Sequence, residues 1–110
     1  MSRAFQIHIS DNVATLLEGV TAGQTVEILG PNRQLISATE AIATGHKIAL
    51  RAVAPAEAIL KFGTRIGHAN QAIAPGAWIH LHNLTSDLDE RSGTLDLHSG
   101  APTDTTSAYV

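Results

Sequence analysis

Two histidines stand two positions apart in the segment IAPGAWIHLHNL, which runs from Ile73 to Leu84. Side chains of an extended strand alternate between faces, so His80 and His82 would project from one face, roughly 7 Å apart along the backbone. Two imidazoles at that spacing could bind one metal ion, with Asn83 adding a neutral oxygen ligand or an orienting hydrogen bond. The spacing alone is more typical of a solvent-facing strand, so it predicts a metal site only with support from elsewhere.

His46 and Lys47 form a second candidate, because they directly follow the turn residue Gly45. Loop ends on a rigid scaffold often present functional side chains. A neighbouring cation opposes protonation of an imidazole, which favours proton acceptance by His46. Lys61 offers a further cation that is suited to pairing with a carboxylate. The same residues are also typical of an exposed, solvated surface, so both interpretations stay open.

The composition limits the kinds of site that the chain can build. Six histidines and no cysteine occur among 110 residues, which excludes thiolate catalysis, disulfides and cysteine metal sites. Imidazole, carboxylate and amide groups remain as ligands. His8 and His68 have no pattern of their own and are candidates for supporting positions, whereas His98 falls in a polar tail.

Size and charge indicate the class of partner. At 110 residues the chain is one small domain, too short to enclose a deep substrate pocket alone, which favours a protein partner and leaves self-association open. Seven scattered Lys and Arg residues and a formal net charge of -3 argue against binding to nucleic acid or to an anionic membrane. The first twelve residues lack the apolar run of a secretory signal, so we expect a cytoplasmic protein.

A short turn followed by a strand recurs along the chain and must position these residues. An apolar residue precedes each turn, and alternating apolar residues follow it, which is typical of short strands. The four copies begin with Val20-Thr-Ala-Gly23, Ile42-Ala-Thr-Gly45, Val53-Ala-Pro-Ala56 and Ile73-Ala-Pro-Gly76. Pro and Gly in the last copy predict a type II turn, whereas Ala56 in the third favours a type I turn. The fold class is therefore mainly β, as a folded-over or barrel-like set of short strands.

The segments between these copies complete the prediction. Alternation over Phe5–Ser10 predicts a first strand with Phe5, Ile7 and Ile9 toward the core, and Val13–Val20 is interpreted as a second strand, with a short helix as the alternative. One short helix is expected at 37–44.

The last copy predicts a strand from Ala77 that carries the histidines. Ala77, Ile79 and Leu81 should face the core, opposite Trp78 and the two histidines. Residues 85–110 are rich in Ser, Thr, Asp and Gly, which predicts a domain at 1–84 followed by a polar C-terminal tail or linker.

Four motifs in register resemble one known family. DNVA at 11–14, GHKIAL at 45–50, KFGTRIGHA at 61–69 and IAPGAWIHLHNL at 73–84 are similar to the N-terminal SAF-type domain of the altronate and galactarate dehydratases. The resemblance implies a β-clip fold with at most one or two short helices. It also implies that the chain is a small subunit acting with a large catalytic dehydratase subunit.

The reaction implied by the resemblance is β-elimination of water from an aldonate or aldarate to a 2-keto-3-deoxy acid. A base removes the proton next to the carboxylate, a cation stabilises the developing charge, and an acid or metal assists the departing hydroxide. The resemblance implies Fe(II) or Mn(II), for which imidazole and oxygen ligands are suitable. Its site assignments are His46, Lys47 and Lys61 for catalysis, Lys61 and Asn83 for substrate binding, and His80 and His82 for metal binding.

Two positions depart from the family's pattern. Phe62 stands where relatives commonly have tyrosine, and Trp78 where many have a further histidine, so any role of that hydroxyl or imidazole is absent here. The same architecture occurs in small subunits of sulfolactate sulfo-lyases, which is the alternative function. A third interpretation is a non-catalytic SAF binding or assembly module, for which the GHK and HLHN motifs are superfluous.

Overall fold

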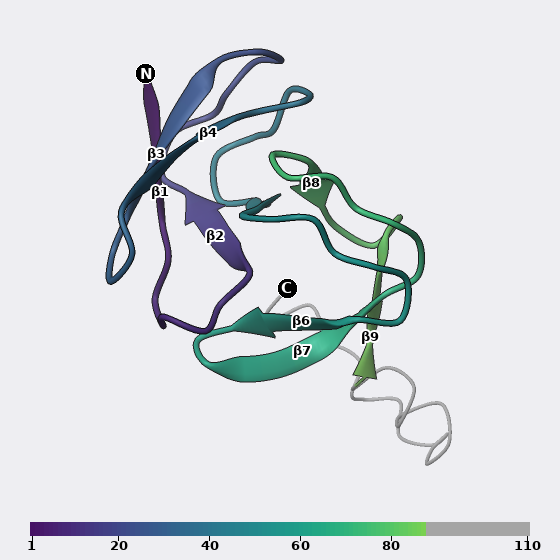
Figure 1. Cartoon of the computed structure of the whole chain (residues 1–110). Coiled ribbons are helices and arrows are strands. Elements are labelled where there is room, and N and C mark those ends of the chain that lie inside the picture. The colour runs from purple at the N-terminus through teal and green to yellow at the C-terminus, as the bar shows by residue number, and fades with distance from the viewer. Residues whose placement is uncertain (88–110) are drawn as a thin grey trace.

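The computed structural model describes residues 1–87, which form short strands joined by turns (Figure 1). The strands are β1 (Ser2–Phe5), β2 (Val13–Leu16), β3 (Thr25–Leu29), β4 (Gln34–Ser37), β5 (Lys47–Ala49), β6 (Ala58–Lys61), β7 (Thr64–Ala69), β8 (Trp78–Ile79) and β9 (Leu84–Ser86). Residues 1–86 contain no helix, so the mainly β class is confirmed and the helix expected at 37–44 is wrong. Within the described residues, no helix is long and apolar enough to cross a membrane.

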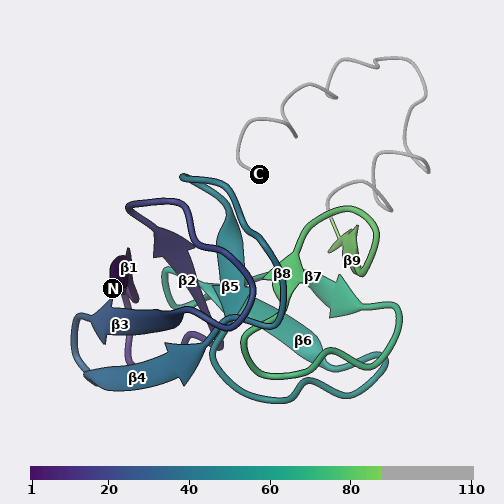
Figure 2. The ribbon, with the colours of Figure 1, turned by 90° about the horizontal axis from the view of Figure 1, so that it is seen from above.

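The strands form two curled sheets. One has six strands in the order β4-β3-β1-β2-β5-β8, and the other has three in the order β6-β7-β9. Neighbouring strands are antiparallel except β1 and β3, which run parallel. In Figure 2, β1 to β4 lie at one end and β6, β7 and β9 at the other, with β5 and β8 between them. This folded-over arrangement is the predicted β-clip fold.

The four predicted turns share one geometry. Each four-residue turn begins one position after the apolar residue of its copy. Its fourth N–H donates to its first carbonyl at 3.0 to 3.1 Å, from Gln24 to Thr21, His46 to Ala43, Glu57 to Ala54 and Ala77 to Ala74. The third residue has a positive φ in every copy, which is 83° at Gly23, 85° at Gly45, 73° at Ala56 and 84° at Gly76. All four are therefore type II turns.

The type I turn expected at Ala56 is wrong for a tertiary reason. The Ala56 N–H donates to the carbonyl of Ala69 at 2.8 Å, and the Ala69 N–H donates to the backbone carbonyl of Glu57 at 2.9 Å. The other three turns make the same pair of bonds with Ala38, Leu16 and Ala49. Sheet pairing thus imposes the left-handed conformation on alanine, although it costs roughly 1–2 kcal/mol.

The apolar residues that precede the turns form backbone hydrogen bonds with each other, which join the four copies in two pairs. Val20 and Ile42 exchange two backbone hydrogen bonds of 2.9 Å, and Val53 and Ile73 do the same. Two buried clusters then form, one on each side of the fold, and their fully buried side chains include Leu16, Ile28 and Ile48 in one and Val13, Ile59 and Ile79 in the other. The repeated device therefore builds the core that supports β5 and β8.

The first strand lies earlier than predicted. β1 ends at Phe5, and Ile7 and Ile9 are 47% and 61% exposed. Gln6 is buried instead, and its Nε2 donates to the carbonyl of Asp11 at 3.0 Å. The hydrogen bonds of one polar side chain thus override the apolar alternation, whereas the strand predicted from Val13 is confirmed over its first four residues.

The last predicted strand is shorter than expected. β8 contains only Trp78 and Ile79, and Leu81 is 62% exposed in a turn. The chain turns because the side chain of Asn83 binds the backbone of His80 and of Trp78. The expectation that Leu81 faces the core is therefore wrong. β9 extends the described domain past residue 84, and the rest of the predicted tail, 88–110, lies outside the described residues.

Candidate active site

His46 occupies a position in its turn that two other copies use differently. Gln24 and Glu57, at the equivalent position, each accept a hydrogen bond from the first N–H of their own turn, at 3.0 and 2.8 Å. The Nδ1 atom of His46 instead accepts a hydrogen bond of 3.1 Å from Nε1 of Trp78. The imidazole is thus directed away from its own turn toward β8.

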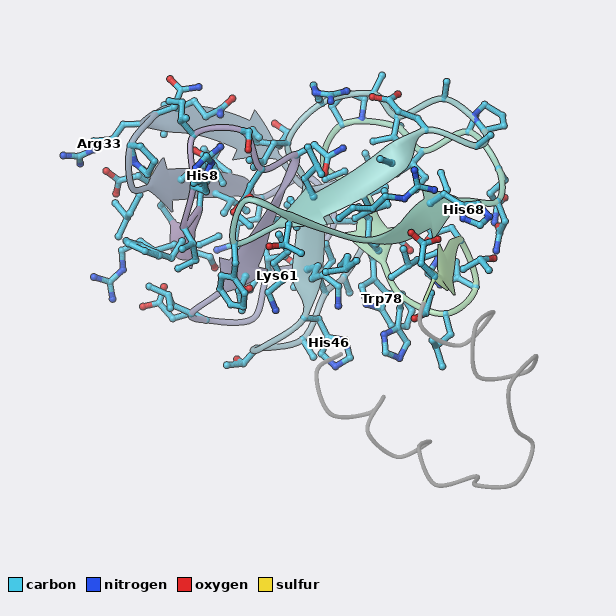
Figure 3. The ribbon with its side chains drawn as sticks, turned by 90° about the horizontal axis from the view of Figure 1, so that it is seen from below. His8, Arg33, His46, Lys61, His68 and Trp78 are labelled. Atoms are coloured by element: carbon cyan, nitrogen blue, oxygen red, sulfur yellow. The ribbon has the colours of Figure 1, made fainter. Side chains whose placement is uncertain are left out.

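Three imidazole rings gather around the indole of Trp78, and we call the four residues the ring cluster: His46, Trp78, His80 and His82. The centroid of the Trp78 ring lies 5.6 Å from His46, 5.4 Å from His80 and 4.9 Å from His82, and the His80 ring stacks on it at an interplanar angle of 11°. The centroids of His46 and His80 are 5.2 Å apart. Figure 3 shows His46 and Trp78 at one edge of the molecule. The structure thus unites residues of two motifs, and His46 and Trp78 are 32 positions apart in sequence.

Polar side chains fix the backbone around Trp78. Its N–H donates to Oε2 of Glu40 at 3.0 Å, and its carbonyl accepts from Nδ2 of Asn83 at 2.9 Å. Oδ1 of Asn83 accepts from the backbone N–H of His80 at 3.0 Å. Substrate binding by Asn83 stays a prediction, and its observed role is to shape the turn. Glu40 was not predicted as a site residue, because its segment was interpreted as a helix.

Lys47 is a buried residue at the start of β5, next in sequence to His46. The residue is 4% exposed, and none of the described residues forms a hydrogen bond or ion pair with its ammonium group. Burial, assisted by repulsion from Lys61, lowers the pKa of Lys47 to about 8. Burial also lowers the pKa of Lys61, while the charge of Asp11 opposes that shift. Such a perturbed lysine in a site is typical of a functional group.

Electrostatics connect the two lysines to the ring cluster. Burial lowers the pKa of His80, and the neighbouring charges of His46, Lys47 and His82 act in the same direction. A neutral His80 is therefore favoured near pH 7, and the surrounding groups favour an anionic ligand. The structure thus brings His46 and Lys47 within electrostatic range of His80, and Lys61 within range of Lys47.

Asp11 positions Lys61 from a distant part of the chain. Its carboxylate accepts hydrogen bonds from the backbone N–H groups of His8 at 3.0 Å, Phe62 at 2.9 Å and Gly63 at 2.7 Å. Phe62 is thereby held at a φ of 60°, which is uncommon for a bulky residue. From sequence, Asp11 was noted only as part of the DNVA motif, which was the available signal.

The histidines by themselves do not fit a metal centre. Among the described residues, no group of three His, Asp or Glu side chains is arranged to bind a metal ion. His80 and His82 do not share one strand face, because β8 ends at Ile79 and both rings pack against Trp78. Metal binding by His80 and His82 stays a prediction, and no chemical step below depends on it.

An open hollow adjoins the ring cluster. It has a volume of 690 Å³, and its mainly apolar lining includes Val20, Ile42, Ala43, His46 and Trp78. The hollow lies where the first two copies of the turn meet. Because it is open on one side, a second protein surface is needed to enclose a small molecule there.

His8 and His68 lie apart from this site (Figure 3). Nδ1 of His8 contacts the hydroxyl of Ser10 at 2.8 Å, and Nδ1 of His68 contacts Asp87 at 3.2 Å. Neither imidazole takes part in the ring cluster.

Comparison with known proteins identifies the family. The family model for the altronate/galactarate dehydratase SAF domain matches residues 2–87, which includes every described strand. The chain belongs to this SAF domain family. The resemblance found from the four motifs is thus confirmed, and the SAF domain's ring cluster draws on the GHKIAL and IAPGAWIHLHNL motifs.

Three relatives differ in how much of their length this SAF domain covers. It is 34% identical to the altronate dehydratases of Bacillus subtilis (strain 168) and Escherichia coli (strain K12), over 93% and 77% of this chain but only 19% and 17% of theirs. It is 35% identical to the (2R)-sulfolactate sulfo-lyase subunit alpha of Chromohalobacter salexigens, over 76% of this chain and 95% of that subunit. The SAF domain therefore occurs both within long lyases and as a short separate subunit.

Proposed function

We propose that the chain is the small subunit of a sugar-acid hydro-lyase, which eliminates water from an aldonate or aldarate to form a 2-keto-3-deoxy acid together with a large catalytic subunit. The observation that carries the proposal is the buried Lys47, which has no partner among the described residues and lies within electrostatic range of Lys61 and His80. Removal of a proton next to a carboxylate requires a base and cations together, and this arrangement provides both.

Each residue receives a role from its surroundings. Lys47, with its pKa lowered to about 8, is the candidate base for the proton next to the carboxylate. Lys61 is the cation that binds the carboxylate, and Asp11 fixes the backbone of the next two residues, Phe62 and Gly63. The open hollow supports the partner, because the large subunit would supply its missing wall. Any Fe(II) or Mn(II) in the assembled enzyme would take most of its ligands from that subunit.

The experiment is reconstitution of the enzyme. The full chain, tagged and expressed in its native cell, should recover a large dehydratase-like subunit, and the pair should convert an aldonate or aldarate to a 2-keto-3-deoxy acid. Lys47→Met should reduce kcat by about 100-fold or more, and Lys61→Met should mainly raise KM. Arg33→Met is the matched control, because Arg33 lies in an exposed ion pair with Glu27. An active pair that is insensitive to Lys47→Met would contradict these roles.

A sulfo-lyase subunit is the second candidate function. It is favoured by one observation, which is that the chain covers 95% of a sulfo-lyase alpha subunit but under a fifth of the dehydratases. The same cations would bind a sulfonated hydroxy acid such as sulfolactate. Release of bisulfite by the reconstituted pair would identify this activity, and formation of the 2-keto-3-deoxy acid would identify the dehydratase.

A non-catalytic module is tested by the same reconstitution. His80→Ala/His82→Ala should leave binding to the large subunit unchanged and lower turnover if the ring cluster has a catalytic role. An unchanged rate would favour the module.

A further inference from the structure

The hydrogen bond between Trp78 and His46 restricts what His46 can do. The indole Nε1 is a donor only, so Nδ1 of His46 must supply a lone pair at 3.1 Å. A neutral imidazole has one protonated nitrogen, and with Nδ1 as acceptor the proton is on Nε2. The remaining ring nitrogen of His46 is then a donor.

The indole is rigidly placed for this purpose. Glu40 and Asn83 bind the backbone N–H and carbonyl of Trp78 at 3.0 and 2.9 Å, and the His80 ring stacks on the indole. His46 also lacks the hydrogen bond with its own turn that Gln24 and Glu57 form at the equivalent position. Trp78 is thus the partner that orients the imidazole of His46.

We propose that Trp78 is a positioning residue that fixes neutral His46 as the tautomer protonated on Nε2, which makes His46 a hydrogen-bond donor to an oxygen of an anionic acid rather than a proton acceptor. The nature of that acid rests on the proposed function, whereas the tautomer is a property of this chain alone. A neutral imidazole that donates to a developing oxyanion is an established device for enolate-forming reactions. Lys47 then remains as the base, and this differs from the proton acceptance expected for His46 from sequence.

Nitrogen NMR of the full chain tests the tautomer without substrate or partner. Long-range proton–nitrogen spectra at pH 8.5 should show His46 as a single neutral tautomer with Nδ1 unprotonated, and His46→Gln assigns its signals. Trp78→Phe, which removes only the donor and keeps an aromatic ring, should shift Nδ1 downfield as its hydrogen bond is lost. A proton on Nδ1 in the native chain would overturn the proposal even if Trp78→Phe fails to fold.

The indole provides a second, independent readout. The chain has one tryptophan, so its Nε1–H signal is unambiguous. His46→Gln should increase the solvent exchange of this proton by at least about 10-fold, because the hydrogen bond protects it, whereas Gln24→His should leave the exchange unchanged. Equal exchange in native chain and His46→Gln would overturn the proposal. A fixed tautomer in a pair without lyase activity would refute the proposed function and leave the positioning role of Trp78 standing.

Discussion

Oδ1 of Asp11 accepts a 2.7 Å hydrogen bond from the backbone N–H of Gly63, at the tip of the β6–β7 hairpin. Asp11 is 6% exposed, and its carboxylate also accepts from the N–H groups of Phe62 and His8, so it ties the loop after β1 to the hairpin that carries Lys61. The position of a candidate site residue thus depends on a carboxylate from a distant segment.

Asp11→Ala should reduce the free energy of unfolding by about 3 kcal/mol, because it leaves three backbone donors without their charged acceptor. Asp11→Asn should cost less, since its carbonyl oxygen can still accept. Urea unfolding measures both variants. Glu27→Ala, which removes an exposed ion pair with Arg33, is the control and should change stability by less than about 1 kcal/mol. Equal stability of the native chain and Asp11→Ala would show that these three hydrogen bonds do not stabilise the fold.

The four type II turns predict opposite effects of glycine and alanine. Ala56→Gly should stabilise the chain by up to about 1 kcal/mol, because relief of the left-handed strain exceeds the added entropy of the unfolded glycine. Gly23→Ala should destabilise by a similar amount, since its φ is 83° and an added Cβ meets nothing within 4 Å. Thermal unfolding of the two variants measures both effects. Destabilisation by Ala56→Gly would contradict a strained, left-handed conformation at Ala56.

Gly76→Ala should be more damaging than Gly23→Ala at nearly the same φ. An added Cβ would lie 2.0 Å from the carbonyl oxygen of Ser37, so the backbone next to β8 must move. We expect a loss of more than about 2 kcal/mol, together with a change in the fluorescence of Trp78. Similar stabilities for the two variants would show that φ alone matters.

These turns also show which features of the fold can be predicted from the sequence. The repeated turn, the strand that follows it and the mainly β class are readable, because Gly and Pro chemistry and period-two alternation are local properties. The conformation of Ala56 and the burial of Gln6 are not, because each depends on hydrogen bonds that the alternation does not specify, with Ala69 for Ala56 and with Asp11 and Leu29 for Gln6. Local propensity yields to tertiary pairing at such positions.

The candidate site could be predicted only in part from the sequence, because it also depends on tertiary pairing. His46, Lys47, Lys61 and His80 stand in recognisable motifs, yet the approach of His46 to His80 depends on the pairing of β5 with β8, which no local pattern specifies. The sequence also placed His80 and His82 on one strand, whereas Asn83 ends the strand through two backbone contacts. Trp78, noted only as a departure from the family, is the centre of the ring cluster.

Lys47 should make stability depend on pH. Because burial, with repulsion from Lys61, lowers its pKa to about 8 from 10.5, the unfolded chain binds more protons than the folded chain between these values. The free energy of unfolding should therefore rise with pH across this window, by an amount on the order of 2 kcal/mol, and the full penalty is present below pH 8.

Urea unfolding of the native chain and of Lys47→Met at pH 7, 8.5 and 10 isolates this effect. The variant should be the more stable protein at pH 7, and the difference should become smaller at pH 8.5 and smaller again at pH 10. A difference that is constant with pH would mean that Lys47 is not buried as a cation.

Asn83 is predicted to couple the turn after β8 to the ring cluster. Asn83→Ala removes the acceptor for His80 N–H and the donor to the Trp78 carbonyl, which should cost about 2 kcal/mol and shift tryptophan emission to the red. Asn83→Asp keeps the acceptor and loses only the donor, so it should have a smaller effect on the His80 turn. Emission that is unchanged in Asn83→Ala would show that the turn persists without this side chain.

His46→Gln separates stability from function. Glutamine at the equivalent position of the first turn accepts a hydrogen bond from its own turn at 3.0 Å, so the variant should be as stable as the native chain or slightly more so. If the proposed function is right, the reconstituted enzyme should lose about 100-fold in kcat with little change in KM, because the donor acts on charge that develops during the reaction. Gln24→His is the reciprocal control, which should weaken the first turn and leave kcat unchanged. Full turnover by His46→Gln would mean that its imidazole plays no part in the chemistry, whereas equal loss in kcat and in binding of the large subunit would make it an interface residue.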